Sequence, residues 1–132
     1  MLRIPSPLTD DLEDIVHRTI GCCIRVHREL GPGYLERIYC RAIAIELECE
    51  GVPYVTERPF EIWYKGYLLS RHFVDLVVGE QVILEVKAVD RLVPLHQAQV
   101  LSYLKASRLK VGLLLNFNSP VMTDGIKRIV QS

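Results

Sequence analysis

Three charged side chains, Asp75, Glu85 and Lys87, stand at a spacing that could assemble a metal site. Asp75 precedes the turn expected at residues 79–81, whereas Glu85 and Lys87 follow it. A three-residue turn there places Asp75 directly opposite Glu85 on two antiparallel strands. Lys87 shares their face, because side chains two residues apart on a strand point the same way. The predicted hairpin therefore gathers two carboxylates and one ammonium group.

The apolar residues of the hairpin favour the same register. One of its faces then carries only apolar side chains, whereas a shift of one residue would mix apolar and charged groups. Phe73, Val77 and Ile83 share the charged face, so we expect that face to be covered as well. The six residues of the purely apolar face are Val74, Leu76, Val78, Val82, Leu84 and Val86.

Two carboxylates at this spacing favour a divalent cation. Opposed side chains on a ladder have Cβ atoms about 4.5–5.5 Å apart, so two partly buried carboxylates repel and one tends to stay protonated. Mg²⁺ or Mn²⁺ relieves the repulsion, since both prefer carboxylate oxygens. Lys87 adds a positive charge where a phosphate or an attacking water would sit. The alternative is a solvated salt-bridge patch, which a covered face disfavours because buried charges are costly unless paired or metal-bound.

Two helices are expected before the strands. The first runs from about Thr9 to Leu30, where Thr9 or Asp10 can cap it and Gly31-Pro32 stops it. The second runs from about Tyr34 to Glu50, and Gly51 is its expected stop. The apolar stripe of the first comprises Leu12, Ile15, Val16, Ile20, Cys23, Val26 and Leu30, and the inward residues of the second are Leu35, Ile38, Tyr39, Ala42, Ile43 and Leu47.

The rest of the chain predicts an α/β fold with a mixed central sheet flanked by helices, in the order α-α-β-β-β-α-β-α. Pro59 indicates an edge strand or a bulge, because proline cannot donate to a sheet ladder. The expected elements after Gly51 are strands at Tyr54–Tyr64, Tyr67–Val78 and Val82–Val89, a helix at Pro94–Ala106, a strand at Leu109–Phe117 and a short helix at Thr123–Val130.

Composition is that of one globular domain over residues 1–132, with 49% hydrophobic and 24% charged residues. Sixteen basic and sixteen acidic residues balance, which argues against a strongly basic nucleic-acid-coating protein but not against a metal site. The four cysteines lack C-x-x-C spacing, so we expect free core thiols rather than zinc or redox chemistry. No apolar run approaches the roughly 20 residues that span a bilayer, and the start lacks a secretory pattern. We therefore expect a cytoplasmic protein.

Several motifs together resemble the PD-(D/E)XK nuclease superfamily, with its restriction-endonuclease-like core, over residues 10–130. Asp75-x9-Glu85-x-Lys87 on a hairpin before a helix matches the pattern after which the superfamily is named. Gly33-Tyr-Leu-Glu36-Arg-Ile-Tyr39 is similar to the G-x-x-E-x-x-Y signature of one small prokaryotic family of nucleases within it. Gln99-x-x-x-Tyr103 resembles the Q-x-x-x-Y motif of exonuclease domains attached to recombination helicases. The residue before Asp75 is Val74 rather than proline.

The resemblance implies a role for each motif residue. Asp75, Glu85 and the backbone carbonyl of Val86 would ligate Mg²⁺ or Mn²⁺, and Lys87 would orient the attacking water and stabilise the phosphate. Glu36 would be a further ligand, directly or through water; the alternative is a residue that favours the start of its helix. Gln99 would position Lys87, the water or the phosphate; the alternative is an exposed helix residue. Tyr103 would support the helix against the site or simply pack, and His96 would contact substrate or cap its helix.

The resulting hypothesis is metal-dependent hydrolysis of phosphodiester bonds in nucleic acid, with DNA as the expected substrate. No second recognition domain is apparent, so we expect a homodimer or a protein partner. Two alternatives stay open: a non-catalytic module of the same fold that binds nucleic acid or protein, and a hydrolase of small phosphoesters. Basic residues that could contact substrate are Arg37, Lys65, Arg71, Arg91 and Lys105.

Overall fold

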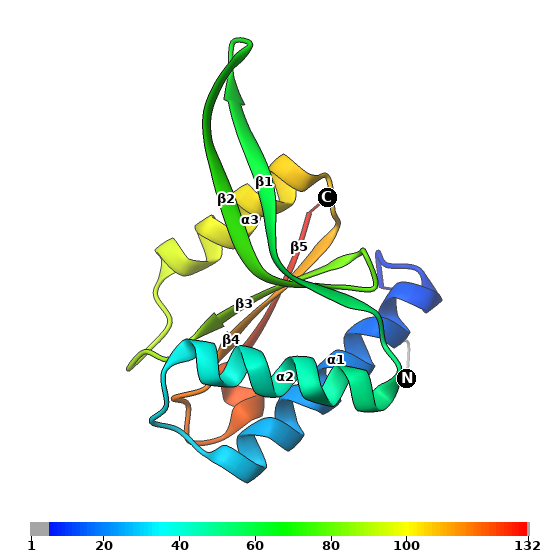
Figure 1. The fold of residues 1–132 in the computed structure, drawn as a ribbon, viewed down its shortest axis with the longest axis vertical. Coiled ribbons are helices and arrows are strands. Elements are labelled where there is room, and N and C mark those ends of the chain that lie inside the picture. The colour runs from blue at the N-terminus through cyan, green and yellow to red at the C-terminus, as the bar shows by residue number, and fades with distance from the viewer. Residues whose placement is uncertain (1–5, 132) are drawn as a thin grey trace.

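The computed structural model describes residues 6–131, and within them five strands form one sheet that lies between helices (Figure 1). The sheet order is β1-β2-β3-β4-β5; β3 and β4 run parallel, and the other neighbours run antiparallel. The elements are α1 (Asp10–Leu30), α2 (Glu36–Glu50), β1 (Tyr54–Tyr64), β2 (Tyr67–Val78), β3 (Val82–Lys87), α3 (Pro94–Ser107), β4 (Val111–Asn116), the 3₁₀ helix η1 (Met122–Gly125) and β5 (Ile126–Val130).

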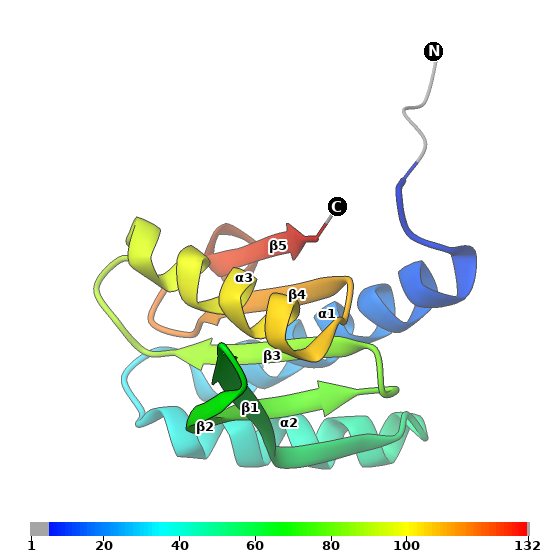
Figure 2. The same cartoon turned by 90° about the horizontal axis from the view of Figure 1, so that it is seen from above.

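The helices cover the two faces of the sheet unequally. Helices α1 and α2 lie on one face and α3 lies on the other (Figure 2). The larger apolar cluster joins α1 and α2 to alternate residues of β2, β3 and β4, and the smaller cluster joins α3 to the residues between them. Strand β4 is buried along its whole length, as expected for a central strand covered on both faces. The predicted mixed sheet flanked by helices is therefore confirmed.

Local capping chemistry sets the ends of the two N-terminal helices. The Thr9 hydroxyl accepts a hydrogen bond from the Leu12 backbone N–H at 3.2 Å, which confirms Thr9 as the cap of α1. Gly51 ends α2 in the left-handed conformation, with φ of 71°. Helix α2 begins only at Glu36, so Leu35 precedes it and is exposed. Ile38 lies within the helix and is also exposed, so the predicted inward placement of both residues was wrong. None of the helices within residues 6–131 has the length and apolar character needed to cross a bilayer.

The four cysteines are free thiols, as expected. Cys22 and Cys23 of α1 are buried in the larger apolar cluster, Cys40 is half-buried and Cys49 is exposed. Burial raises the pKa of Cys40 to about 12, so this thiol stays protonated and is a poor nucleophile.

The last element differs from the prediction. The short helix expected at Thr123–Val130 is instead η1 followed by strand β5, which pairs antiparallel with β4 from Val111↔Val130 to Leu115↔Ile126. Without β5, the buried strand β4 would expose an unpaired backbone edge, and buried N–H and C=O groups require partners. The backbone groups at this edge of β4 need hydrogen-bond partners, and this requirement favours a strand over a helix in residues 126–130.

Strands β1 and β2 extend beyond the rest of the sheet as a two-stranded arm (Figure 1). We use the term "the arm" for residues 58–73. Pro59 lies on β1, one of the two edge strands of the sheet, which confirms the predicted edge position. A register shift between Ile62 and Trp63 changes the pairing near the turn at residues 65–66.

Candidate active site

The β2–β3 hairpin has the predicted register, but its backbone pairing stops where the charged residues begin. The paired residues are Leu76↔Leu84, Val77↔Ile83 and Val78↔Val82. Beyond Leu76 the two strands separate, and carboxylates bridge the gap. The Val86 N–H donates to Asp75 Oδ2 at 2.7 Å, and the Asp75 N–H donates to Glu85 Oε1 at 3.4 Å. Each carboxylate thus accepts a hydrogen bond from the neighbouring strand.

The separation of the strands changes the faces of two predicted residues. Val74 was expected on the same face as Val86, yet it packs in the cluster beneath α3, while Val86 packs toward α1 and α2. Phe73 was expected to be covered and is 62% exposed. Both expectations were wrong because β2 leaves the sheet at Asp75 to form the arm. The other apolar residues of the hairpin lie on the expected faces.

Burial makes both carboxylates reluctant to ionise. Glu85 is only 7% exposed. Burial raises the pKa of Glu85 to about 7, and the charge of Asp75 acts in the same direction, while Lys87 opposes it. Burial likewise raises the pKa of Asp75, although the hydrogen bond from Val86 lowers it. This is the behaviour expected of two close carboxylates in a partly buried site.

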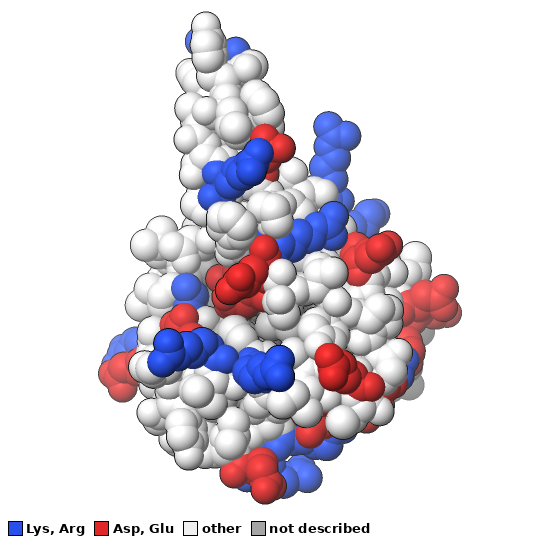
Figure 3. Space-filling model, viewed as in Figure 1, with Lys and Arg blue, Asp and Glu red and all other residues white. Residues whose placement is uncertain are grey.

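Asp75 opens onto a pocket of about 460 Å³ between α2 and the base of the arm. Acidic side chains gather in this part of the surface, with basic side chains on either side (Figure 3). Glu36 of α2 lines the pocket, and its charge contributes to the raised pKa of Asp75. The full lining is Glu36, Arg37, Cys40, Arg41, Ala44, Tyr54, Thr56, Glu57 and Asp75.

The loop before Glu36 is held by the other two residues of the G-x-x-E-x-x-Y motif. Gly33 has φ of 112°, a conformation that side chains rarely adopt, and its N–H donates to Asn118 Oδ1 at 3.1 Å. The buried Tyr39 hydroxyl donates to the Gly31 carbonyl at 2.6 Å and accepts from the Tyr34 N–H at 3.1 Å. These contacts position the first turn of α2, from which Glu36 extends.

Helix α3 brings Tyr103 near the carboxylates. Tyr103 is half-buried against the cluster under α3, which supports the packing role. Burial raises its pKa, and the charges of Glu85 and Asp75 raise it further. Gln99 is half-buried one helical turn earlier. His96 caps its helix, because its Nδ1 accepts a hydrogen bond from the Val93 N–H at 3.1 Å.

Glu57 is a pocket residue that the sequence did not indicate. A two-residue turn without a register shift would have placed Thr56 opposite Asp75. The shift between Ile62 and Trp63 moves β1 by one residue, so Glu57 lies between the pairs that flank Asp75. Glu57 has φ of 52°, and its charge raises the pKa of Asp75. No local pattern reveals such a bulge, so this residue was not predictable from the sequence.

Asn116 is a second residue that sequence reasoning did not assign a role. It lies on β4 opposite Lys87 and is buried. Its Oδ1 accepts from the Val89 N–H at 3.1 Å, and its Nδ2 donates to the Val89 carbonyl at 3.0 Å. This double contact holds the segment that follows Lys87. Of the five predicted basic contacts, Arg37 lines the Asp75 pocket, where it is joined by Arg41.

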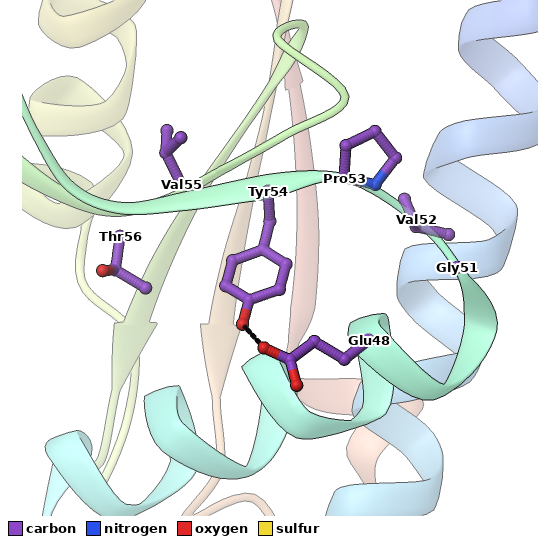
Figure 4. Close-up of a pocket in the computed structure, with 7 residues that line it drawn as sticks. All are labelled: Glu48, Gly51, Val52, Pro53, Tyr54, Val55 and Thr56. Atoms are coloured by element: carbon purple, nitrogen blue, oxygen red, sulfur yellow. Dashed lines mark hydrogen bonds between the residues drawn. The ribbon is translucent and has the colours of Figure 1, made fainter.

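A neighbouring pocket has fewer side chains that could bind a metal or act in catalysis. It is formed by the end of α2 and the start of β1, and its Tyr54 hydroxyl donates to the Glu48 carboxylate (Figure 4). Tyr54 and Thr56 line both pockets, so this one is continuous with the wall of the Asp75 pocket. Glu48 is the only acidic side chain in its lining.

The donor set suits a hard divalent cation. Half-buried Asp75 and buried Glu85 supply carboxylate oxygens whose mutual repulsion a cation would remove. Among the described residues, no three histidine, cysteine, aspartate or glutamate side chains converge as a ligand set. Glu36 shares the pocket of Asp75 without completing such a group.

Comparison with known proteins agrees with this geometry. A family model described as the PD-(D/E)XK nuclease superfamily matches residues 13–129. The comparisons with curated proteins and with solved structures give no significant match. The matched segment contains α2, β1, the β2–β3 hairpin, α3 and β4, and thus every element that carries a candidate site residue. The chain belongs to the PD-(D/E)XK nuclease superfamily.

Proposed function

We propose that this protein is a Mg²⁺- or Mn²⁺-dependent nuclease that hydrolyses phosphodiester bonds, with DNA as its substrate. The observation that carries the proposal is the carboxylate pair at the point where β2 leaves β3. Glu85 is buried and Asp75 is half-buried, each accepts a hydrogen bond from the other's strand, and burial raises the pKa of both. Such an arrangement lowers the stability of the fold, so a purely structural role does not explain it. The superfamily match supports a catalytic role.

The proposed roles follow from the position of each group. Asp75, Glu85 and the Val86 carbonyl would hold the cation, which polarises the phosphate and lowers the pKa of water when bound. Lys87, whose charge acts on both carboxylates, would orient the attacking water and stabilise the negative phosphate. Gln99 would help position these groups from α3.

Glu36 has a proposed role at the opposite wall of the site. It lines the pocket of Asp75 from α2, within reach of a cation or its water shell. The anchoring of Gly33 and Tyr39 on either side of it supports narrower membership in the G-x-x-E-x-x-Y family, since those residues hold the helix start that presents Glu36. Arg37 and Arg41 line the same pocket and would contact substrate phosphates.

The test is cleavage of a nucleic-acid panel by the full chain in Mg²⁺ or Mn²⁺. The panel contains single-stranded, duplex, flapped and branched DNA, and RNA. We expect cleavage that is abolished by EDTA and reduced at least about 100-fold by Lys87→Ala, because a charge at the reacting phosphate contributes on this scale. Lys110→Ala is the matched control, since Lys110 is exposed just before the end of β4 that pairs with Val82, whereas Lys87 pairs with the other end; it should retain full activity.

Metal titration distinguishes the remaining interpretations. Calorimetry with Mn²⁺ should show binding to the wild-type protein and to Asp14→Ala, whose side chain is exposed on α1, and none to Asp75→Ala. Mn²⁺ binding without any cleavage would favour a module that binds nucleic acid without cutting it. Turnover of small phosphoesters without cleavage of polymers would favour the small-phosphoester hydrolase. Absence of both binding and cleavage would refute the proposal.

A further inference from the structure

One face of the arm carries an exposed strip that the proposed catalytic chemistry does not use. Directly opposed residues on two strands share a face. Phe60 and His72 are one such pair, and they face α3: Phe60 packs in the cluster under that helix, and the His72 ring lies 5.5 Å from Tyr103. The alternate pairs therefore face away from α3. We use the term "arm strip" for these six residues, Pro59↔Phe73, Glu61↔Arg71 and Trp63↔Leu68.

The arm strip is apolar at both ends and charged in its centre. Phe73 is 62% exposed, Trp63 is 58% exposed and Leu68 is 45% exposed. Glu61 and Arg71 lie between them and are also exposed. Pro59 with Phe73, and Trp63 with Leu68, thus form two exposed apolar pairs, and exposed apolar patches mark interaction sites. A two-stranded hairpin is also only marginally stable when nothing covers it. The arm extends away from the rest of the chain, so nothing else in residues 6–131 covers this strip (Figure 1).

Charge argues against nucleic acid as the occupant of the strip. Proteins bind nucleic-acid backbones by neutralising phosphates with several lysine or arginine side chains. The arm strip has one arginine, and Glu61 directly opposite cancels its charge. The other four residues are apolar. A protein surface fits this composition better.

The order of residues makes the strip complementary to itself. A two-fold interface uses the same patch on both copies. With a two-fold axis along the arm, β1 of one copy lies over β2 of the other. Glu61 then meets Arg71 of the second copy, and Arg71 meets its Glu61. Trp63 likewise meets Leu68, and Pro59 meets Phe73, so each contact within the strip joins groups of matching character.

We propose that the arm strip is a homodimer interface in which two copies of this chain pack arm against arm. Its six residues would bury on the order of 600 Å² per copy, or about 1,200 Å² in total, which is the lower end of the range for stable specific interfaces. This interface is separate from the carboxylate site and does not depend on its proposed activity.

Two single charge reversals and their mixture test the interface. Light scattering on the full chain should show a mass that rises with concentration from 15.1 kDa toward twice that value. Glu61→Arg alone and Arg71→Glu alone should each weaken the dimer at least about tenfold, because like charges then meet across the axis. An equimolar mixture of the two variants should regain the dimer, since each reversed charge meets its opposite on the other chain. Misfolding of either variant could not produce this recovery.

Trp63, the only tryptophan, gives a second readout. Its emission should shift to shorter wavelength as the dimer forms, and Val121→Glu, an exposed apolar position beside η1, should leave both mass and emission unchanged. A wild-type protein that stays at 15.1 kDa, or a dimer that resists both reversals, would overturn the proposal. So would a monomer whose Trp63 emission responds to added DNA oligonucleotide, which would assign the strip to nucleic acid.

Discussion

Glu85→Gln should stabilise the protein in the absence of metal at pH 8, although it removes a residue of the candidate site. Glutamine has nearly the same shape and keeps a carbonyl oxygen that can accept the hydrogen bond from the Asp75 N–H. It lacks the charge that burial and the neighbouring Asp75 disfavour. The substitution therefore removes an electrostatic cost without creating a cavity.

The magnitude follows from the shift in pKa. Burial raises the pKa of Glu85 from its usual value near 4.5 to about 7. Each pKa unit corresponds to about 1.4 kcal/mol, so ionised Glu85 lowers the free energy of unfolding by about 3 kcal/mol. Below pH 4.5 the carboxyl is protonated in both the folded and unfolded states, and no penalty exists. As the pH rises from 4.5 to 7 only the unfolded state loses its proton, so the wild type loses stability across this window.

Urea unfolding in EDTA measures the difference between variant and wild type. We expect the free energies of unfolding to be similar near pH 4.5, to separate by about 1.4 kcal/mol per pH unit, and to differ by about 3 kcal/mol above pH 7. Glu29→Gln is the control because Glu29 is exposed on α1, and its difference should not vary with pH. A difference for Glu85→Gln that stays flat between pH 5 and 8 would refute the reasoning that burial opposes this charge.

Two further predictions concern the residues that hold the site in place. Tyr39→Phe should lower the free energy of unfolding by about 1–3 kcal/mol, since it leaves the Gly31 carbonyl and the Tyr34 N–H without their partner. Urea unfolding measures this loss, with Tyr54→Phe as the control because the Tyr54 hydroxyl bonds only the exposed Glu48. A loss for Tyr39→Phe no larger than that of the control would contradict the prediction. Asn116→Ala should lower the free energy of unfolding by a similar amount and should speed amide hydrogen exchange at residues 88–93, because both hydrogen bonds to Val89 disappear. Unchanged exchange in that segment would show that Asn116 does not hold it.

Much of the candidate site was predictable from the sequence because its geometry is local. The turn after Val78 and the alternation of apolar residues determine the β2–β3 register, and the structure has that register. Asp75 and Glu85 therefore meet, although the ladder ends at Leu76 and their side chains contact backbone N–H groups of the neighbouring strands. The helix caps were predictable for the same reason, since Thr9 and Gly51 contact backbone groups only a few residues away along the chain.

Other features depended on contacts between distant segments. Glu57 reaches the pocket only because a bulge shifts β1 by one residue, and the bulge has no local sequence signal. Leu35 was expected to be buried from its helical spacing, but it precedes the first residue of α2 and is exposed.

The sequence by itself determined the superfamily motifs, most helices and strands, and the pairing of the two central carboxylates. These depend on backbone preferences and side-chain alternation over a few residues. Only the tertiary structure decided that residues 126–130 form a strand, that Val74 and Phe73 leave their expected environments, and that Glu57 shares a pocket with Asp75. The physical reason is that these features depend on contacts between segments that are distant in the sequence: the pairing of a strand edge, the divergence of the arm from the sheet, and the packing of a helix. Such contacts leave no pattern among the residues that are neighbours along the chain.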